Sequence, residues 1–372
     1  MDNKKTVAYL TRHTVSNYGS VLQAYATQTA LEKLGCNAVC INYYRTDEKT
    51  ENIVDTRLKS VSAKWNKNAL TRLFFKATQK PVYKFADKRF EEYRKIVKVT
   101  DKEYNSEAEL KSDIPKADIY MTGSDQVWNT VACGEIDPVY FLSFLPKKVK
   151  KIAYAASFGG ASVEEKNKTR IKSWLKEYNK ITIRENSGIK IASELGIHAE
   201  QVLDPTFLLD KNEWEKLIPN RKCDEKYVLV YQLHPNKQFD AYAKEFAKRK
   251  GLKLYRVSHC FHHIVRSGKF ICCPPVGEFL WYIKNAEYFL TDSFHGTAFS
   301  IGLNTQFVDV LPKSYSERIS SILELIGYEN RILKSYDDFK IAEEKIDFNK
   351  VNEIISTERK KSFDILKDMI GD

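Results

Sequence analysis

Apolar runs that end in small polar residues and continue into helical patterns recur along this chain, and the clearest case lies at residues 288–302. Its apolar half ends in Asp292, Ser293 and His295, and Gly296 then opens a segment with helical spacing. This pattern predicts a strand, a tight turn and a helix. In parallel α/β sheets such turns lie at the carboxyl ends of strands, where helix N-termini attract anions. We therefore expect either an anion-handling active site or an ordinary turn in which Asp292 and Ser293 cap the helix.

The N-terminal residues repeat this strand, turn and helix pattern. An apolar strand is predicted at 6–12, a helix from Val21, and a second strand at 38–44. The first loop contains Asn17 and Gly19, residues that tolerate a left-handed backbone and let a ligand approach closely. Neither a GxGxxG sequence nor a Walker sequence is found, so dinucleotide and P-loop nucleotide binding lack their usual sequence support.

Further segments of the same kind follow, each an apolar run that ends in polar residues. The predicted strands are 117–122, 151–158, 181–183, 200–203, 227–233, 252–258, 288–291 and 306–311. Helical patterns between such strands are typical of βα units with a parallel sheet. The chain is therefore predicted to be an α/β protein.

A length of 372 residues exceeds what one hydrophobic core usually organises. The step from Asp204 to Pro205 forces an extended exit from its strand and marks a change of domain. We expect an N-terminal α/β domain at 1–208, a C-terminal α/β domain at 209–345, and a helix at 346–372 that packs at the junction. Strand-end loops of both domains would then point into a cleft, which suits an enzyme with two substrates.

Composition indicates a soluble protein of a reducing compartment. The apolar runs are far shorter than the ~20 residues that cross a bilayer, and the first residues lead directly into a strand pattern. The seven cysteines are scattered without CxxC spacing, which favours reduced thiols. The histidine and cysteine cluster at 259–263 lacks a distant second pair of ligands, so no metal site is predicted. A cytoplasmic location follows.

Most of the net charge of +11 lies in one segment, residues 57–98. This segment has 13 lysines and arginines against three acids, and it also contains many aromatic and aliphatic residues. The combination predicts a helical insertion with basic amphipathic helices. Such helices can rest on an anionic membrane surface, bind nucleic acid, or pack on their own domain with a solvated basic exterior. No recognisable nucleic-acid module accompanies them, so no nucleic-acid partner is predicted.

Six motifs stand at the predicted strand ends and helix starts. They are Asn17-Tyr18-Gly19 with Leu22-Gln23-Ala24-Tyr25, Gly123–Asn129 (GSDQVWN), Tyr154–Gly159 (YAASFG), Arg184-Glu185, Asp204-Pro205-Thr206 and Thr291–Gly296 (TDSFHG). In this order they resemble the polysaccharide pyruvyl transferase family over about residues 6–330. The resemblance implies two Rossmann-like domains in the arrangement of GT-B glycosyltransferases. It also implies transfer of pyruvate from phosphoenolpyruvate to two hydroxyls of a sugar, as a cyclic ketal, with release of phosphate and no cofactor besides this co-substrate.

The resemblance implies roles for individual residues of the donor site. His295 would be a phosphate ligand and acid, Asp125 an acid or base, and Asp292 would orient His295, act as a base, or merely cap the helix. Further donor contacts are implied for a second set of residues: Ser293, Gly296, Thr297, Arg184 and Arg318. An ion pair between domains is the alternative for Arg184 with Glu185.

The sugar acceptor would lie on the N-terminal side. The implied acceptor contacts are Asn17, Tyr18, Gln126, Trp128, Asn129 and Ser157. Trp128 would be either a platform for a sugar face or a core anchor beneath its loop. Turn structure is the alternative for Asn17 and Ser157.

One position departs from the family pattern. Characterised members carry an arginine two residues before the turn histidine, and here that position is Ser293. Because phosphoenolpyruvate carries a carboxylate and a phosphate, cations are needed. Either the donor pocket differs, or another cation replaces the arginine, with Arg184, Arg318 and Arg12 as candidates. Arg318 is notable because the helix dipole disfavours a cation at a helix start.

The sequence therefore predicts a pyruvyl transferase of bacterial capsule or exopolysaccharide biosynthesis. Its acceptor would be a glycan or lipid-linked sugar, and residues 57–98 would hold the protein peripherally at the inner membrane face. One alternative is a GT-B-type glycosyltransferase that uses a nucleotide sugar. The other is a non-catalytic sugar-binding member of the family, for which the missing arginine is the motive.

Overall fold

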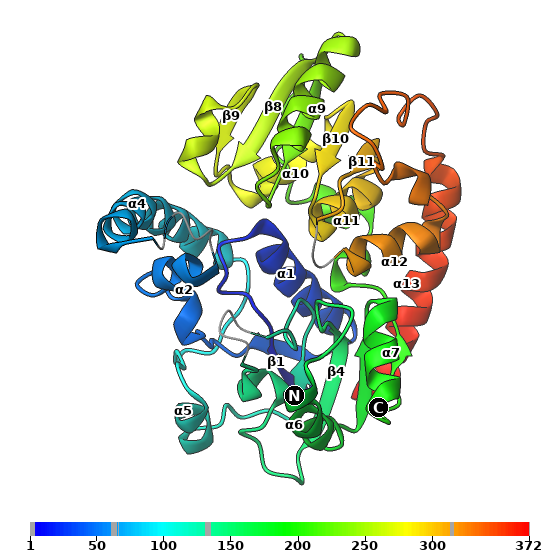
Figure 1. Cartoon of the computed structure of the whole chain (residues 1–372). Coiled ribbons are helices and arrows are strands. Elements are labelled where there is room, and N and C mark those ends of the chain that lie inside the picture. The colour runs from blue at the N-terminus through cyan, green and yellow to red at the C-terminus, as the bar shows by residue number, and fades with distance from the viewer. Residues whose placement is uncertain (1–3, 61–64, 66, 131–134, 313–315, 372) are drawn as a thin grey trace. The chain divides into compact units, whose positions relative to one another are not determined.

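The computed structural model describes residues 4–60, 65, 67–130, 135–312 and 316–371. The chain divides into two compact units, each built on one parallel β-sheet (Figure 1). Unit 1 comprises residues 1–205 and 362–372, and unit 2 comprises residues 206–361. The predicted α/β class is confirmed for both.

The sheet of unit 1 has six strands among the described residues, in the order β2-β1-β3-β4-β5-β6, and all neighbours are parallel. The strands are β1 (Thr6–Leu10), β2 (Asn37–Cys40), β3 (Ile119–Thr122), β4 (Lys150–Ala156), β5 (Lys180–Ile183) and β6 (Glu200–Gln201). Strands β1, β3 and β4 are buried over nearly their whole length. Such burial is expected of a parallel sheet that is covered on both faces.

The helices of unit 1 follow the strand ends. They are α1 (Tyr18–Lys33), α2 (Ile53–Ser60), α4 (Ala69–Arg94), α5 (Glu107–Ser112), α6 (Glu165–Leu175) and α7 (Asn186–Glu194), with the 3-10 turns η1 (Thr46–Glu48) and η2 (Pro138–Phe141). Helices α2 and α4 occupy the basic segment 57–98, which confirms the prediction of a helical insertion; residues 61–64 and 66 of that segment lie outside the described residues. No helix in the described ranges is long and apolar enough to cross a membrane.

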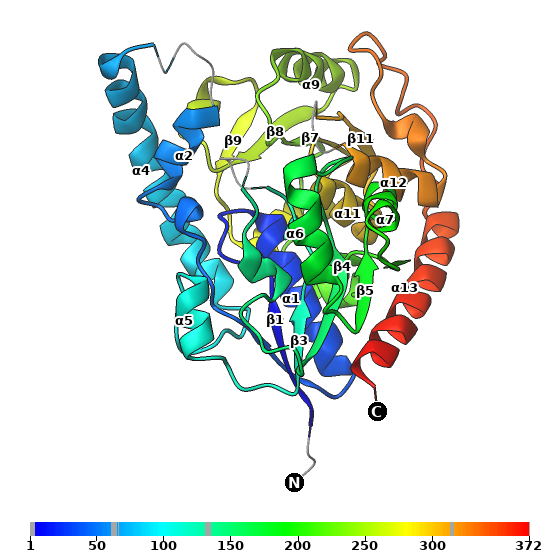
Figure 2. The same cartoon turned by 60° about the horizontal axis from the view of Figure 1, so that its bottom comes forward.

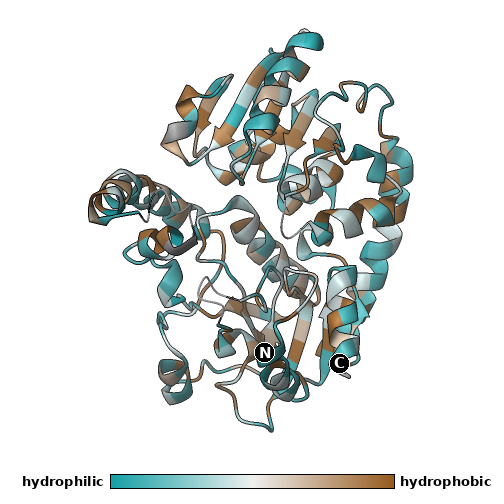
Figure 3. Ribbon diagram, in the orientation of Figure 1, coloured by the Kyte–Doolittle hydropathy of each residue, from teal (hydrophilic) through white to brown (hydrophobic). Residues whose placement is uncertain are grey.

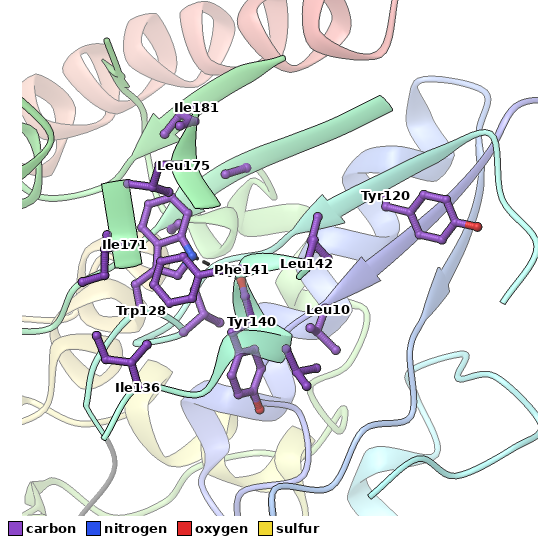
Figure 4. Packing of buried hydrophobic residues seen from close by; sticks show 14 of the residues in the cluster. Leu10, Tyr120, Trp128, Ile136, Tyr140, Phe141, Leu142, Ile171, Leu175 and Ile181 are labelled. Carbon is purple, nitrogen blue, oxygen red and sulfur yellow. Dashed lines mark hydrogen bonds between the residues drawn. The ribbon is translucent and has the colours of Figure 1, made fainter. Parts of the chain in front are cut away.

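The core of unit 1 includes a cluster of large side chains around Trp128 (Figure 4). The indole is 1% exposed, and its centroid lies 5.5 Å from that of Phe141 and 5.1 Å from that of Phe158. Its Nε1 donates to the carbonyl of Tyr140 at 3.2 Å, which satisfies the one polar atom of a buried indole. The loop that follows β3 is thereby held down on the core.

The sheet of unit 2 has the order β11-β10-β7-β8-β9 in the described part of the chain, again with parallel neighbours. Its strands are β7 (Tyr227–Tyr231), β8 (Lys253–Ser258), β9 (Lys269–Cys272), β10 (Tyr288–Thr291) and β11 (Phe307–Asp309). Its helices are α8 (Lys211–Glu215), α9 (Lys237–Arg249), α10 (Val276–Lys284), α11 (Phe294–Leu303) and α12 (Glu317–Ile326), with the 3-10 turns η4 (Phe261–Val265) and η5 (Glu329–Arg331).

The two units change over at residues 205–206, within the 3-10 turn η3 (Pro205–Phe207) and close to the boundary predicted after residue 208. The C-terminal helix α13 (Phe348–Ile370) is not a separate part of the chain. Its residues belong to unit 2 through Lys361 and to unit 1 from Ser362.

Several strands are shorter than the sequence predicted, among them β1, β7 and β11, and one strand was not predicted. Strand β2 ends at Cys40, before the predicted end at residue 44. Strand β9 at the edge of the second sheet was not predicted, because four residues with an exposed lysine at one end give little alternation to detect. Figure 3 shows the mixed hydropathy of this edge of the sheet.

Two helical glycines of unit 2 provide a matched test of this packing. A Cβ added at Gly277 would lie 2.1 Å from the carbonyl oxygen of Leu217, whereas one added at Gly302 would meet nothing within 4 Å. We expect Gly277→Ala to lower the free energy of unfolding by about 1–3 kcal/mol, because the backbone near Leu217 must move. Gly302→Ala should leave it unchanged or raise it by up to about 1 kcal/mol. Urea denaturation of both variants is the measurement, and equal stability would contradict the close contact with Leu217.

Candidate functional site

Both sheets reverse their strand order at a point where predicted site loops emerge. In unit 1 the reversal lies between β1 and β3, and in unit 2 it lies between β7 and β10. Ligands of open α/β sheets bind beyond the carboxyl ends of strands at such points. The loops after β1 and β3 and the turn after β10 therefore stand where binding residues are expected.

Asp125 follows β3 in a conformation that non-glycine residues rarely adopt, with φ of 74°. Its carboxylate accepts a hydrogen bond from Ser20 of α1 at 2.8 Å and another from the backbone N–H of Gln126 at 2.8 Å. The side chain is buried, with 6% of the residue exposed. Uncommon backbone geometry that is held in place by several contacts is frequent at functional sites.

Arg184 lies immediately after β5 and joins several loops of unit 1. Its Nη1 donates to Asp204 and to the Ser124 hydroxyl at 3.2 Å, and its guanidinium lies 3.7 Å from Asp125 and 3.6 Å from Glu185. Burial lowers the pKa of Arg184, but the three carboxylates outweigh this effect and raise it, so that the cation is retained. These contacts all lie inside unit 1, and the predicted donor contact of Arg184 stays a prediction.

Two predicted acceptor residues pair with each other beside Asp125. The Nδ2 of Asn129 donates to Oε1 of Gln126 at 3.0 Å, and both residues are partly exposed. Gly159, with φ of 76°, approaches them so closely that a Cβ there would lie 2.8 Å from the Asn129 amide nitrogen. The pair therefore presents amide groups at the edge of the loop.

Three other predicted acceptor residues have structural contacts. Trp128 is in the core, as described above, so the structure favours the core-anchor interpretation over a sugar platform. The Ser157 hydroxyl is fully buried and accepts from the N–H of Gly159 at 3.0 Å. Tyr18 is 1% exposed and lies 5.0 Å from the Phe90 ring, centroid to centroid. None of these three side chains is exposed to a ligand in this conformation.

Asn17 is the N-cap of α1, and its side chain accepts from the N–H of Gly19 at 2.8 Å. It is only partly buried, so the cap leaves part of the amide accessible. This position is compatible with both interpretations of Asn17, namely turn structure and acceptor contact.

Arg12 lies just beyond β1 and shares a carboxylate with a second arginine. Both Arg12 and Arg45 contact Glu48 of η1, Arg45 at 2.8 Å, and Arg45 also lies 2.6 Å from Asp47. This cluster places two cations near the first switch point. No local sequence pattern points to Glu48 or Arg45, because Glu48 stands 36 residues from Arg12.

In unit 2, the predicted turn after β10 is confirmed as the start of α11. Ser293 is the N-cap, and its hydroxyl accepts from the N–H of Gly296 at 3.3 Å. A Cβ at Gly296 would lie 2.5 Å from the Thr291 hydroxyl oxygen, so only glycine permits this close approach of helix and strand. Ser293 alone supplies the cap, and the interpretation of Asp292 as helix cap is wrong.

Asp292 instead fastens the turn to the neighbouring loop after β7. Its carboxylate accepts from the backbone N–H of Leu233 at 2.7 Å and of His234 at 2.9 Å, and Nδ1 of His234 lies 3.1 Å from it. The His234 side chain is 48% exposed, which leaves its other edge available to solvent. His234 follows the predicted strand 227–233, but no local pattern points to its role, since its contact with Asp292 spans 58 residues.

Arg318 lies beside the first turn of α11. Its guanidinium carbon is 5.7 Å from the centroid of the Phe294 ring, and the Phe294 and His295 rings are 5.1 Å apart. His295 itself is 7% exposed. The structure thus brings one of the three candidate cations to the turn in which the family arginine is replaced by Ser293.

Asp309, a buried acid at the end of β11, contacts the first turn of α11. Thr297 of α11 has its hydroxyl oxygen 2.7 Å from Asp309 and 3.1 Å from the Ser293 carbonyl. One hydroxyl proton cannot serve both acceptors fully, and a protonated Asp309 satisfies both contacts. Burial raises the pKa of Asp309 to about 8, and the Asp292 carboxylate adds to this effect. No motif in the sequence pointed to Asp309.

Within the described residues, no group of three or more His, Cys, Asp or Glu side chains is placed to hold a metal ion.

Asp309 makes stability depend on pH. Because its folded pKa exceeds the ordinary value, its contribution to stability is fully present below about pH 4 and is lost as the pH rises toward 8. Asp309→Asn cannot ionise, so it should gain stability relative to the wild type across this window, by up to about 1.4 kcal/mol per pH unit. Denaturant melts at several pH values measure the difference. Asp224→Asn, at an exposed aspartate, is the control, and a difference for Asp309→Asn that does not change with pH would contradict a protonated Asp309.

Solved structures of similar fold share little sequence with this chain. UDP-GlcNAc 2-epimerase from Neisseria meningitidis, bound to UDP-GlcNAc, aligns with a TM-score of 0.50 and 10% identity over 99% of each chain. The S. aureus MnaA structure with UDP aligns with a TM-score of 0.52 and 10% identity over 91% of this chain and 86% of that one. Curated proteins give no significant match. The structural similarities establish the two-unit GT-B fold and nothing finer.

The family is shown by a sequence comparison instead. The family model described as polysaccharide pyruvyl transferase matches residues 17–354, which include all six motifs. This chain therefore belongs to the polysaccharide pyruvyl transferase family.

Proposed function

We propose that this protein transfers pyruvate from phosphoenolpyruvate to two hydroxyls of a sugar in a bacterial surface-polysaccharide precursor. The observation that carries the proposal is the position of Arg318 beside the helix start that holds His295, at the switch point of unit 2. There a cation, a histidine and a helix N-terminus adjoin one another, which suits a small dianionic donor. This helix start is fixed by a cap and by close packing, which come from Ser293, Gly296 and Thr297.

In the proposed reaction, C3 of phosphoenolpyruvate gains a proton and C2 becomes oxocarbenium-like. One sugar hydroxyl attacks C2 and gives up its proton, and the C2–O bond to phosphate breaks. The second hydroxyl then attacks C2 and also gives up its proton, which closes the ketal. The two protons released balance the one that C3 gains and the one that leaves on the phosphate. The net result is a cyclic ketal and one inorganic phosphate, with no cofactor. His295 binds the departing phosphate and supplies a proton to it, while Arg318 balances the charge of the donor.

The acceptor side is proposed in unit 1. Asp125 acts as acid or base, and the amides of Gln126 and Asn129, with Asn17, bind sugar hydroxyls. Arg184 contacts the carboxylates of Asp125 and Asp204. Because the first of these contacts holds Asp125 in place, we assign Arg184 a positioning role in unit 1. Asp292 positions the loop that holds His234.

The cellular setting is part of the proposal. The acceptor is a lipid-linked sugar of capsule or exopolysaccharide synthesis, and the enzyme works in the cytoplasm at the inner membrane face. The basic residues of 57–98 support this part, since anionic lipids attract such a segment.

The reaction is tested by product mass. Candidate glycolipids and soluble glycans incubated with the protein and phosphoenolpyruvate should gain the mass of pyruvate less water, with one equivalent of phosphate released. His295→Ala and Asp125→Asn should reduce this product at least a hundredfold, because each removes a group needed for proton transfer.

The same assay separates the alternatives. Product formation with a nucleotide sugar in place of phosphoenolpyruvate would show a glycosyltransferase instead. Binding of glycan in calorimetry without turnover of any donor would show a non-catalytic sugar-binding protein.

Arg318 is tested by its effect on the donor. Arg318→Ala should lower kcat/KM for phosphoenolpyruvate by roughly 10- to 150-fold, because a hydrogen bond to a charged group contributes about 1.5–3 kcal/mol. Arg318→Lys should recover part of this loss, since the charge remains but the planar fork is lost. Initial rates at varied donor concentration provide the measurement.

Arg221 supplies the matched control in the same unit. It also stacks on an aromatic ring, with its guanidinium carbon 4.2 Å from the centroid of Trp281, but it lies at α10, not at the turn after β10. Arg221→Ala should leave kcat/KM unchanged. Equal losses for both variants, or no loss for Arg318→Ala, would exclude Arg318 as the donor cation.

A further inference from the structure

The buried side of helix α4 packs on unit 1. Phe75 packs with Val54 and Leu58 of α2, and nearer the C-terminus the Phe90 ring packs against Tyr18 of α1. Figures 1 and 2 both show α4 beside α2 at one side of unit 1. The residues of this buried side recur at helical spacing: Phe75, Val82, Ala86, Phe90 and Tyr93.

The opposite side of α4 begins with three large apolar residues in solvent. Leu70 is 77% exposed, Leu73 is 65% exposed and Phe74 is 61% exposed. Their spacing of three and four places them together on the face that the buried side leaves free. Phe74 stacks on the Trp65 ring, 6.2 Å from centroid to centroid, and still leaves most of its surface in solvent. Figure 3 shows the mixture of apolar and polar residues along the helix.

The same exposed face continues as a row of lysines. Lys80, Lys84 and Lys88 are exposed and four residues apart, so they follow the apolar group along one side of the helix. Lys67 and Arg72, also exposed, lie close to the apolar group in sequence. From residue 56 to residue 86 the sequence has eight lysines and arginines and no acid.

We propose that this face of α4 docks on an anionic lipid bilayer, with Leu70, Leu73 and Phe74 inserted at the level of the head groups and Lys80, Lys84 and Lys88 on the surrounding phosphates. The inference rests on the membrane part of the proposed function and adds the residues and the mode of contact. An apolar group that leads a basic row fits a bilayer surface, where both kinds of contact are available at once.

Charge and shape favour this partner over two others. A second copy of the chain would bring the same row of lysines, and the two rows would repel each other. A nucleic acid would neutralise the lysines through its phosphates but would leave aliphatic side chains such as Leu70 and Leu73 in water. Only the bilayer uses both halves of the face.

Docking also has a consequence for the acceptor. Tyr18 packs against Phe90 and lies next to Asn17, one of the proposed acceptor contacts. Helix α4 and the acceptor loop are therefore one packed assembly inside unit 1. A lipid-linked sugar would be presented to a loop that the docked helix holds near the membrane surface.

The experiment is flotation of the full-length protein with vesicles of phosphatidylglycerol in phosphatidylcholine, against phosphatidylcholine alone. The wild type should bind only the anionic vesicles. Replacing Leu70, Leu73 and Phe74 together by serine should weaken binding at least tenfold at constant lipid charge. Lys80→Gln, Lys84→Gln and Lys88→Gln should each weaken it about fivefold, because one basic residue near an anionic surface contributes on the order of 1 kcal/mol.

Matched controls lie in the other unit and in α13. Leu325→Ser changes an exposed leucine of α12, and Lys350→Gln and Lys361→Gln change exposed lysines. These variants should bind as the wild type does. A Phe74→Trp variant adds a direct readout, since its fluorescence should be quenched by brominated lipid only in anionic vesicles.

Several results would overturn the inference. They are absence of binding to anionic vesicles, binding unaffected by the triple serine variant, and light scattering that shows a dimer which this variant dissociates. Equal salt-dependent binding to DNA that the triple variant also loses would point to nucleic acid.

Failure of the proposed reaction is distinguishable from failure of docking. The triple variant should still convert a soluble glycan at the wild-type rate, because its changes lie on the outer face of α4. Loss of vesicle binding by the wild type with intact turnover would reject docking alone. Vesicle binding without turnover of phosphoenolpyruvate would reject the reaction alone.

Discussion

The buried guanidinium of Arg184 is the interaction on which the arrangement of the unit 1 loops depends. A cation withdrawn from water must be compensated by nearby carboxylates, and here the compensation comes from Asp204, Asp125 and Glu185. These residues follow different strands, so the charge balance fixes the ends of β3, β5 and β6 relative to one another. Asp125 keeps its uncommon backbone conformation because this network and the Ser20 hydroxyl hold it.

In unit 2 the buried charged group is an anion, and backbone N–H groups compensate its charge. The buried carboxylate of Asp292 takes two backbone N–H groups from the loop after β7, and so it joins the two strands of the switch point. Asp309, close to it, is kept neutral by burial, since two adjacent buried anions would repel each other. The result is a rigid helix start that carries His295 and adjoins Arg318, where the position of the family arginine is filled by a small capping serine.

Helix α4 follows a different rule from the rest of unit 1. Its buried side is satisfied by its contacts with α1 and α2, and its exposed side departs from the usual avoidance of grouped apolar residues in solvent. No acidic residue occurs from residue 56 to residue 86, so the sequence of this stretch is strongly basic. The apolar half and the basic half of this face both suit the proposed lipid surface, which is a partner outside unit 1.

The sequence by itself determined the α/β class, the strand-end positions of Asp125, Arg184 and Asp292, and the family, because apolar periodicity and short motifs are local properties of a chain. Only the tertiary structure decided which of these side chains meet. It shows that Trp128 is buried and that Ser293, not Asp292, caps the helix. It also adds three residues to the candidate site: Glu48, His234 and Asp309. Their contacts join residues that are distant in sequence, and such contacts are set by strand order and burial, which no local pattern encodes.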